Sequence, residues 1–185
     1  MNRREALELG VALAGGALAY GCVRPRPEAP VAKERTMNTR PLMTVRILAD
    51  TVQSLGTGPQ GARTFVPVKG GDFEGDRLRG RILPGGGDWL LLRADGVLEL
   101  DLRITLETDD KALVDMRFVG VRHGPPEVIA ALGRGESVEP ERYYFRTLPR
   151  FEASAAKYAF LNRIVTVGSG ETRPDGAIHR IDEVL

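Results

Sequence analysis

The sequence is poor in the residues that most often build metal sites and disulfides. It has one cysteine, Cys22, and two histidines, His123 and His179, which lie far apart in the chain. A single cysteine excludes an intramolecular disulfide, and these residues form no zinc-binding motif. No spacing typical of an EF-hand calcium loop occurs either. We therefore predict no bound metal.

Motifs for nucleotide binding and for a nucleophilic serine are also missing. The glycines at 85–87 are not followed by Lys and then Ser or Thr, so we expect no phosphate loop. Gly168-Ser169-Gly170 lacks the spacing of a nucleophile elbow. Residues 41–185 carry 19 Lys and Arg against 21 Asp and Glu. Without clustered positive charge, nucleic acid is excluded as an expected partner. No cofactor is predicted.

Residues 1–22 have the pattern of an export signal. Arg3 and Arg4 precede an apolar run of 11 residues, Leu9–Ala19. This run is too short to cross a bilayer core of ~30 Å as a helix, but it fits the apolar part of a signal peptide. The arginine pair resembles the start of a twin-arginine signal. We therefore predict an exported protein that folds before transport.

Two processing routes remain open for this segment. Ala17-Leu18-Ala19 matches a cleavage site that would release a soluble protein into the periplasm. Alternatively, Leu18–Cys22 resembles a lipoprotein box, in which Cys22 carries the lipid, although Tyr20 departs from the usual small residue. Lipidation is favoured because the only cysteine stands at the modified position. Residues 23–40, with several prolines and no apolar periodicity, are predicted to form a flexible linker.

From residue 41 onward, apolar and polar residues alternate with the period of two typical of half-buried strands. The clearest segment is Leu98–Leu106, where Leu and Ile occupy one face while Glu99, Asp101 and Arg103 occupy the other. Turn residues separate similar segments, and short helices are expected at 125–132 and 154–161, the latter with Ser154 as N-cap. The other predicted strands are 43–49, 63–68, 78–83, 89–93, 113–121, 143–148, 164–168 and 178–184. Residues 41–185 are thus predicted to be mostly β: a single antiparallel β-barrel of about eight to nine strands with one or two short helices.

Several sequence blocks occur together in a characteristic order. They read KGGDFEGDRLRGRILPGGGDW, RADGVLELDLRITLETDD, GPPEVIAALGRGESVEPERYYFRTLPRFE and FLNRI. In this order they resemble the domain of unknown function 3237 family, also called uncharacterised protein family 0311, over residues 42–184. The resemblance implies an antiparallel β-barrel that usually forms oligomers and has no established general activity. Ile104 and Ala153 depart from the family pattern, in which an aromatic and a hydroxyl residue are expected.

A candidate site follows from the polar residues on the predicted strands. In a barrel every second side chain points into the lumen. If the polar face of Leu98–Leu106 does so, arginines could hold an anionic or aromatic small molecule, and Asp101 could act as general acid or base. If that face meets solvent, Asp101 and Arg103 are an ordinary surface pair. The predicted ligand-binding residues are Trp89, Arg93, Arg103, Tyr144 and Arg146.

Three functions are compatible with these observations. The first is binding of a small organic anion or aromatic metabolite in the barrel. The second is a cofactor-free isomerase, cyclase or lyase that works by proton transfer through Asp101. The third is an interaction module at the cell envelope. The expected partners are a small molecule and further copies of the chain, with membrane contact only through a lipid on Cys22.

Overall fold

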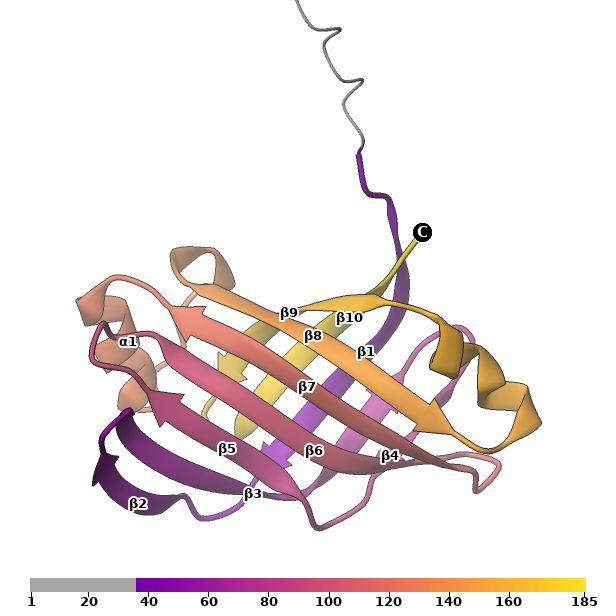
Figure 1. The fold of residues 1–185 in the computed structure, drawn as a ribbon, viewed down its shortest axis with the longest axis horizontal. Coiled ribbons are helices and arrows are strands. Elements are labelled where there is room, and N and C mark those ends of the chain that lie inside the picture. The colour runs from indigo at the N-terminus through magenta and orange to yellow at the C-terminus, as the bar shows by residue number, and fades with distance from the viewer. Residues whose placement is uncertain (1–35) are drawn as a thin grey trace, which may run out of the picture. The chain divides into compact units, whose positions relative to one another are not determined.

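A computed structural model describes residues 36–185 of the chain (Figure 1). The predicted signal segment, the lipidation site Cys22 and most of the predicted linker lie outside the described residues. Within the described part, the chain forms ten antiparallel strands, one α-helix and two 3₁₀ helices. None of the helices between residues 36 and 185 has the length and apolar character needed to cross a membrane.

The elements follow one another along the chain as a series of strands interrupted by three helical segments. They are β1 (Thr39–Ala49), β2 (Gln53–Gly58), β3 (Gly61–Glu74), β4 (Arg79–Ile82), β5 (Gly87–Leu92), β6 (Leu98–Thr108), β7 (Leu113–His123), α1 (Pro126–Gly133), η1 (Pro140–Arg142), β8 (Tyr144–Ala153), η2 (Ala156–Arg163), β9 (Thr166–Arg173) and β10 (Gly176–Val184). The first residues of β1 belong to the predicted linker, and Thr39 pairs with Val184 of β10.

The strands close into a barrel. Their order is β1, β10, β9, β8, β7 and β6, followed by β4 and β5 and then β3, which pairs with β1. β5 pairs with the first half of β3 and β4 with its second half, so the two short strands share one position between β3 and β6. The ring therefore has eight strand positions, which confirms the predicted barrel. β2 extends the sheet as a hairpin with β3.

The interior is built from the apolar face of each strand. On β6, Leu100, Leu102 and Leu106 are at most 7% exposed, whereas Arg103 on the opposite face is exposed. The apolar face of Leu98–Leu106 therefore points into the barrel. This resolves the question that alternation left open, because the face that carries Asp101 and Arg103 is the outer one.

The helices occupy different ends of the barrel (Figure 1). Val128 and Leu132 of α1 are buried in the core, as are Tyr158 and Leu161 of η2. The predicted second helix is thus present, as a 3₁₀ helix, but its predicted N-cap was wrong. The Tyr158 amide donates to the carbonyl oxygen of Ala155 at 2.9 Å, so Ala155 caps the helix and Ser154 makes no cap bond.

Candidate functional site

The inner faces of the strands line a pocket of about 220 Å³ in the barrel, with the exposed Val52 and Arg173 at its open edge. This volume is far larger than the ~10–15 Å³ that a single water needs by the same measure. Most of its lining residues are apolar, including Phe118 and Phe145. We call it the lumen pocket, and four ionisable side chains line it: Asp88, Arg122, His179 and Arg173, the last of which is exposed and pairs with Glu171.

Asp88 enters the lumen pocket from β5. It shares the inner face of this strand with Leu90, while Trp89 on the other face is exposed. The Asp101 backbone N–H donates to Asp88 Oδ1 at 3.0 Å, between the register pairs Asp88–Leu102 and Leu91–Glu99. Burial raises the pKa of the Asp88 carboxyl to about 7, and that hydrogen bond opposes the rise only in part. Near neutral pH Asp88 is therefore present in both protonation states.

Arg122 enters from the end of β7, opposite Phe145 of β8. Its Nη1 donates to Thr172 Oγ1 at 2.9 Å, and its guanidinium carbon lies 5.9 Å from the centre of the Phe145 ring. Its Nε is buried and has no hydrogen-bond partner in the described part of the chain. Burial lowers the pKa of Arg122 from its ordinary value, yet an arginine with so high a starting pKa stays charged.

Arg122 and Asp88 lie in the same pocket without forming a salt bridge. No ion pair between residues 36 and 185 involves either side chain. A buried charge without a direct partner is costly, because water is lost without full replacement. An anion that reached Arg122 would compensate for this cost.

His179 enters from β10 and is 1% exposed. Its ring packs against Phe118 and Phe145, with centroids 4.8 and 5.2 Å apart. Burial lowers the pKa of the imidazole to about 4, so the ring is neutral near pH 7. Its Nδ1 is buried and lacks a hydrogen-bond partner among residues 36–185. His179 thus offers the pocket a neutral aromatic surface with unused hydrogen-bonding capacity.

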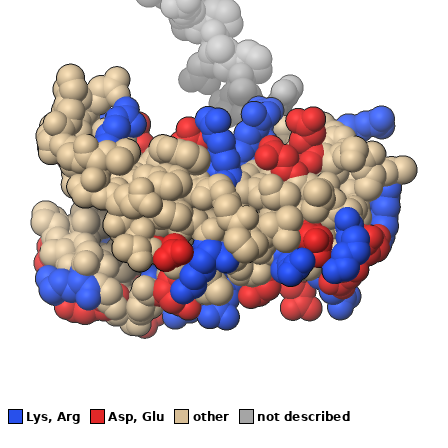
Figure 2. Space-filling model, turned by 90° about the horizontal axis from the view of Figure 1, so that it is seen from below, with Lys and Arg blue, Asp and Glu red and all other residues tan. Residues whose placement is uncertain are grey.

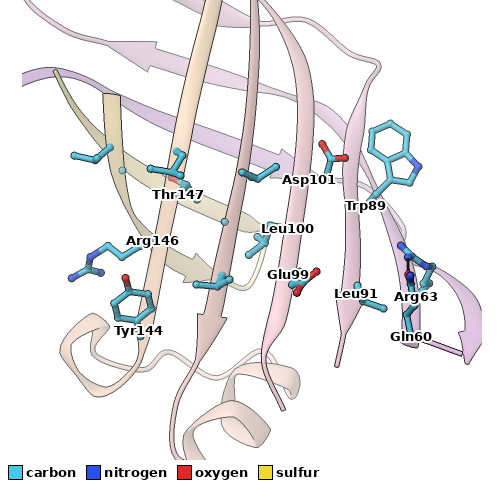
Figure 3. A pocket seen from close by; sticks show the side chains of 16 residues that line it. Gln60, Arg63, Trp89, Leu91, Glu99, Leu100, Asp101, Tyr144, Arg146 and Thr147 are labelled. Atoms are coloured by element: carbon cyan, nitrogen blue, oxygen red, sulfur yellow. Dashed lines mark hydrogen bonds between the residues drawn. The ribbon is translucent and has the colours of Figure 1, made fainter. Parts of the chain in front are cut away.

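The residues predicted from sequence lie on the outside of the barrel. A groove of about 910 Å³ runs across the outer faces of neighbouring strands and contains four of the six. Tyr144 and Arg146 lie at one side of this groove and Trp89 and Asp101 at the other (Figure 3). Arg146 Nη1 donates to the carbonyl oxygen of Phe145 at 3.0 Å, and the guanidinium lies 5.1 Å from the Tyr144 ring centre.

The other two predicted residues make ion pairs on the surface. Arg93 donates to Asp95 at 2.5 Å and to Glu99 at 3.2 Å. Arg103 and Asp101 approach to 3.3 Å with both side chains substantially exposed. These pairs match the alternative interpretation of the polar face as a solvent-facing one, and exposed ion pairs add little to stability because water screens them.

Sequence reasoning did not predict Asp88, Arg122 or His179 of the lumen pocket as site residues. The signal was available for Arg122, since it continues the apolar inner series Val114, Met116, Phe118 of β7 and places a charge at its end. Asp88 directly precedes the predicted strand 89–93 and was not included in it, although Asp88 alternates with Leu90 toward the inside. A charged residue that alternates in step with the apolar residues of a strand is predicted to face the interior, and this pattern would have identified Asp88 and Arg122.

No group of three or more His, Cys, Asp or Glu side chains that could hold a metal ion occurs in the described chain. The fold and the lumen pocket together define a small antiparallel β-barrel with an acid, a cation and a neutral imidazole around an apolar cavity. A family model described as a protein of unknown function, DUF3237, matches residues 37–184. The chain belongs to this family.

Related sequences and solved structures support this assignment. The chain is 36% identical over 150 residues to the UPF0311 protein RPA1785 of Rhodopseudomonas palustris, covering 81% of this chain and 98% of that protein. The crystal structure of RPA1785 superposes with a TM-score of 0.80, covering 82% of this chain and all of that one. A β-barrel-like protein of Acinetobacter baumannii is also 36% identical, with a TM-score of 0.72 and coverage of 84% and 100%. An enzyme from Penicillium herquei shares the fold alone, at 15% identity and a TM-score of 0.64, with coverage of 84% and 99%.

Proposed function

We propose that the protein binds a small organic anion with a flat apolar body, such as an aromatic carboxylate or a phenolate, in the lumen pocket. The observation that carries this proposal is the half-buried guanidinium of Arg122, which has one hydrogen bond, a buried Nε without a partner and no ion pair in the described chain. The aromatic side chains of Phe118 and Phe145 would cover the apolar body of the ligand. The protein is proposed to act after export, which rests on residues 1–22 alone.

Thermal unfolding with a panel of aromatic carboxylates and phenols tests this proposal. A ligand at 100 times its dissociation constant is expected to stabilise the native protein by ~2.7 kcal/mol. We expect the stabilisation to disappear in Arg122→Met, which keeps an unbranched, flexible side chain but removes the guanidinium and its charge. The matched control Arg146→Met changes the outer groove and should keep the stabilisation.

The reverse result would contradict the lumen assignment. If Arg146→Met abolished the stabilisation and Arg122→Met preserved it, the ligand would bind in the outer groove, with the residues predicted from sequence. A panel without any stabilising compound would count against ligand binding and in favour of an interaction module.

A second function is favoured by Asp88, whose raised pKa suits proton transfer near neutral pH. Asp88 would accept a proton from a carbon next to a carbonyl group of the ligand. The electron pair of the broken C–H bond would move to the carbonyl oxygen, where Arg122 would stabilise the negative charge. Return of the proton from Asp88 to another atom would complete an isomerisation without any cofactor. The enzyme from Penicillium herquei indicates only that this fold can house catalysis.

Hydrogen–deuterium exchange at carbon, followed by NMR in D₂O, measures this proton transfer directly on a ligand that binds. We expect Asp88→Asn to slow the exchange by ~10²–10⁴-fold while binding changes little. Asp101→Asn, a change on the outer face that removes only one smaller contribution to the raised Asp88 pKa, should slow the exchange far less than Asp88→Asn does. Loss of exchange in Asp101→Asn alone would make Asp101 the acid or base, and binding without exchange in the unaltered protein would exclude the proposed chemistry for that ligand.

A further inference from the structure

Two polar groups in the wall of the lumen pocket are left without all of their hydrogen bonds. Arg122 has a buried Nε with no partner among residues 36–185, and His179 has a buried Nδ1 with none in the same part of the chain. Both side chains line the pocket. A buried polar atom without a partner is costly, because it has given up its hydrogen bonds to water. These two residues therefore mark where a bound molecule could supply what the protein does not.

Many positive charges on the outer surface are already compensated. On the face shown in Figure 2, Lys and Arg side chains stand beside Asp and Glu side chains. Arg93 and Arg103, for example, have carboxylate partners within the chain. Arg122 differs from them, since the partner of its Nη1 is the neutral hydroxyl of Thr172. An anion therefore gains more from the buried guanidinium than from these surface arginines.

Strands β9 and β10 set the spacing between the two polar groups. Arg122 Nη1 donates to Thr172 Oγ1 of β9, and His179 of β10 is paired with Gly170 of β9. Thr172 and Gly170 are two residues apart, which corresponds to ~7 Å along an antiparallel strand. The Phe145 ring packs over Gly170, where a Cβ would overlap it. The guanidinium and the imidazole are thus offset along the wall by roughly the length of one substituted benzene ring, and Phe145 lies near both.

The two groups require different partners. The guanidinium of Arg122 suits a carboxylate, which can accept two hydrogen bonds from it. The imidazole of His179 is neutral near pH 7, so one ring nitrogen donates and the other accepts. A hydroxyl group both donates and accepts and therefore fits either tautomer. A second carboxylate would only accept, and it would bring another charge into a mostly apolar pocket.

The size of the lumen pocket limits the body of the ligand. Its volume is about 220 Å³. An apolar cavity of ~150 Å³ is large enough to hold one benzene molecule. The lumen pocket therefore has room for a single aromatic ring with two small substituents.

We propose that the ligand of the lumen pocket is a monocyclic aromatic carboxylate with a neutral hydroxyl group on the far side of its ring, as in para-hydroxybenzoate. Arg122 binds the carboxylate, Phe145 covers the ring, and His179 forms a hydrogen bond with the hydroxyl group. In ortho-hydroxybenzoate the two substituents are adjacent, so the molecule cannot reach both side chains. The proposal rests on the proposed binding of an anion in the lumen pocket and does not require proton transfer by Asp88.

Isothermal titration calorimetry with para-hydroxybenzoate and para-methylbenzoate tests this proposal. Both compounds carry the carboxylate, and the methyl group is close in size to the hydroxyl group but forms no hydrogen bond. We expect the hydroxyl compound to bind the unaltered protein ~10-fold more tightly, as one net hydrogen bond would give. Ortho-hydroxybenzoate should bind no more tightly than para-methylbenzoate.

His179→Phe is the matched variant, because phenylalanine keeps an aromatic ring without any hydrogen-bonding atom. The preference for the hydroxyl compound should disappear, while para-methylbenzoate should bind at least as tightly as before. Retained binding of the methyl compound would also show that the variant is folded. Arg122→Met should instead weaken both para compounds by a similar factor, since each loses the partner of its carboxylate.

Failure of this proposal can be distinguished from failure of the proposed function. The hydroxyl assignment is overturned, and anion binding stands, if both para compounds depend on Arg122 but bind equally well. The same conclusion follows if the preference survives in His179→Phe or if the ortho compound binds as tightly as the para compound. If neither para compound binds, or if Arg122→Met leaves their binding unchanged, this proposal fails together with the proposed anion site.

Discussion

In Asp88→Asn, the free energy of unfolding is expected to increase by about 3 kcal/mol as the pH rises from 4 to 6.5. In the unaltered protein this increase is cancelled by an opposite contribution from Asp88. The rise belongs to His179. Its pKa is about 4 in the folded protein and about 6.5 as an ordinary histidine. Between these values the unfolded chain binds more protons than the native one, so stability increases with pH.

Asp88 conceals this rise because its pKa moves the other way. Its carboxyl titrates near pH 7 when folded and near 3.8 ordinarily, so the native state binds the extra proton within that window. Stability from Asp88 is present at low pH and is lost as pH rises, by about 4 kcal/mol across the whole window. The two slopes oppose each other from pH 4 to 6.5. Above pH 6.5 only the decrease from Asp88 continues.

Urea unfolding at several pH values measures these slopes in four proteins: the unaltered chain, Asp88→Asn, His179→Gln and the double variant. Differences between variants cancel the contribution of other titrating groups. His179→Gln should show the opposite slope, with stability falling as pH increases toward 7. A steep rise in the unaltered protein that Asp88→Asn leaves unchanged would show that Asp88 does not titrate in this window. Asp88→Asn should also be the more stable protein at pH 8, at the expense of the proposed proton transfer.

Alanine in place of Gly71 is expected to lower the free energy of unfolding by roughly 3 kcal/mol. Gly71 has a φ of 139°, and it pairs with Ile47 of β1 on one side and with Ile82 of β4 on the other. A Cβ at this position would overlap the backbone carbonyl oxygen of Arg46. Backbone cannot move aside as the end of a flexible side chain can, and β1 and β3 form the contact that closes the ring.

Gly133→Ala is the matched control for this change. Gly133 ends α1, and a Cβ there would meet no atom within 4 Å. Alanine also favours a helix over glycine by up to ~1 kcal/mol. Chemical denaturation should therefore show a large loss for Gly71→Ala and no loss for the control. Equal midpoints for the two variants would contradict the proposed role of Gly71 in closing the barrel.

Alternation was sufficient to predict the barrel because it is a local property of each strand. The residues of Leu98–Leu106 alone indicate that this segment is a strand and which residues lie on each of its two faces. β2 was missed because Gln53–Gly58 is exposed at every position and carries no apolar pattern. Its pairing with β3 depends on the hairpin at Pro59 and Gln60, not on burial.

The lumen pocket could not be predicted in the same way. The pKa of Asp88 depends on burial by strands distant in sequence and on an amide of β6. His179 meets Phe118 and Phe145 only after the ring has closed. Without these contacts, the acidic and basic residues of Leu98–Leu106 were the most conspicuous candidates. Four of the six predicted residues do share one groove, but it faces outward.

On β7, neighbouring residues in the sequence belong to opposite sides of the wall. The even-numbered positions from Val114 to Arg122 face the lumen, and the odd-numbered positions from Leu113 to Val121 face outward. Mutations at the lumen-facing positions can therefore be selected without changing the outward-facing positions, although the two kinds of position alternate in the same strand. A substitution at an even-numbered position changes the lining of the lumen pocket, and one at an odd-numbered position changes the outer surface. Between β5 and β6 the two sides of the wall are linked directly. The inward-facing Asp88 carboxylate accepts a hydrogen bond from the backbone N–H of Asp101, whose side chain faces outward.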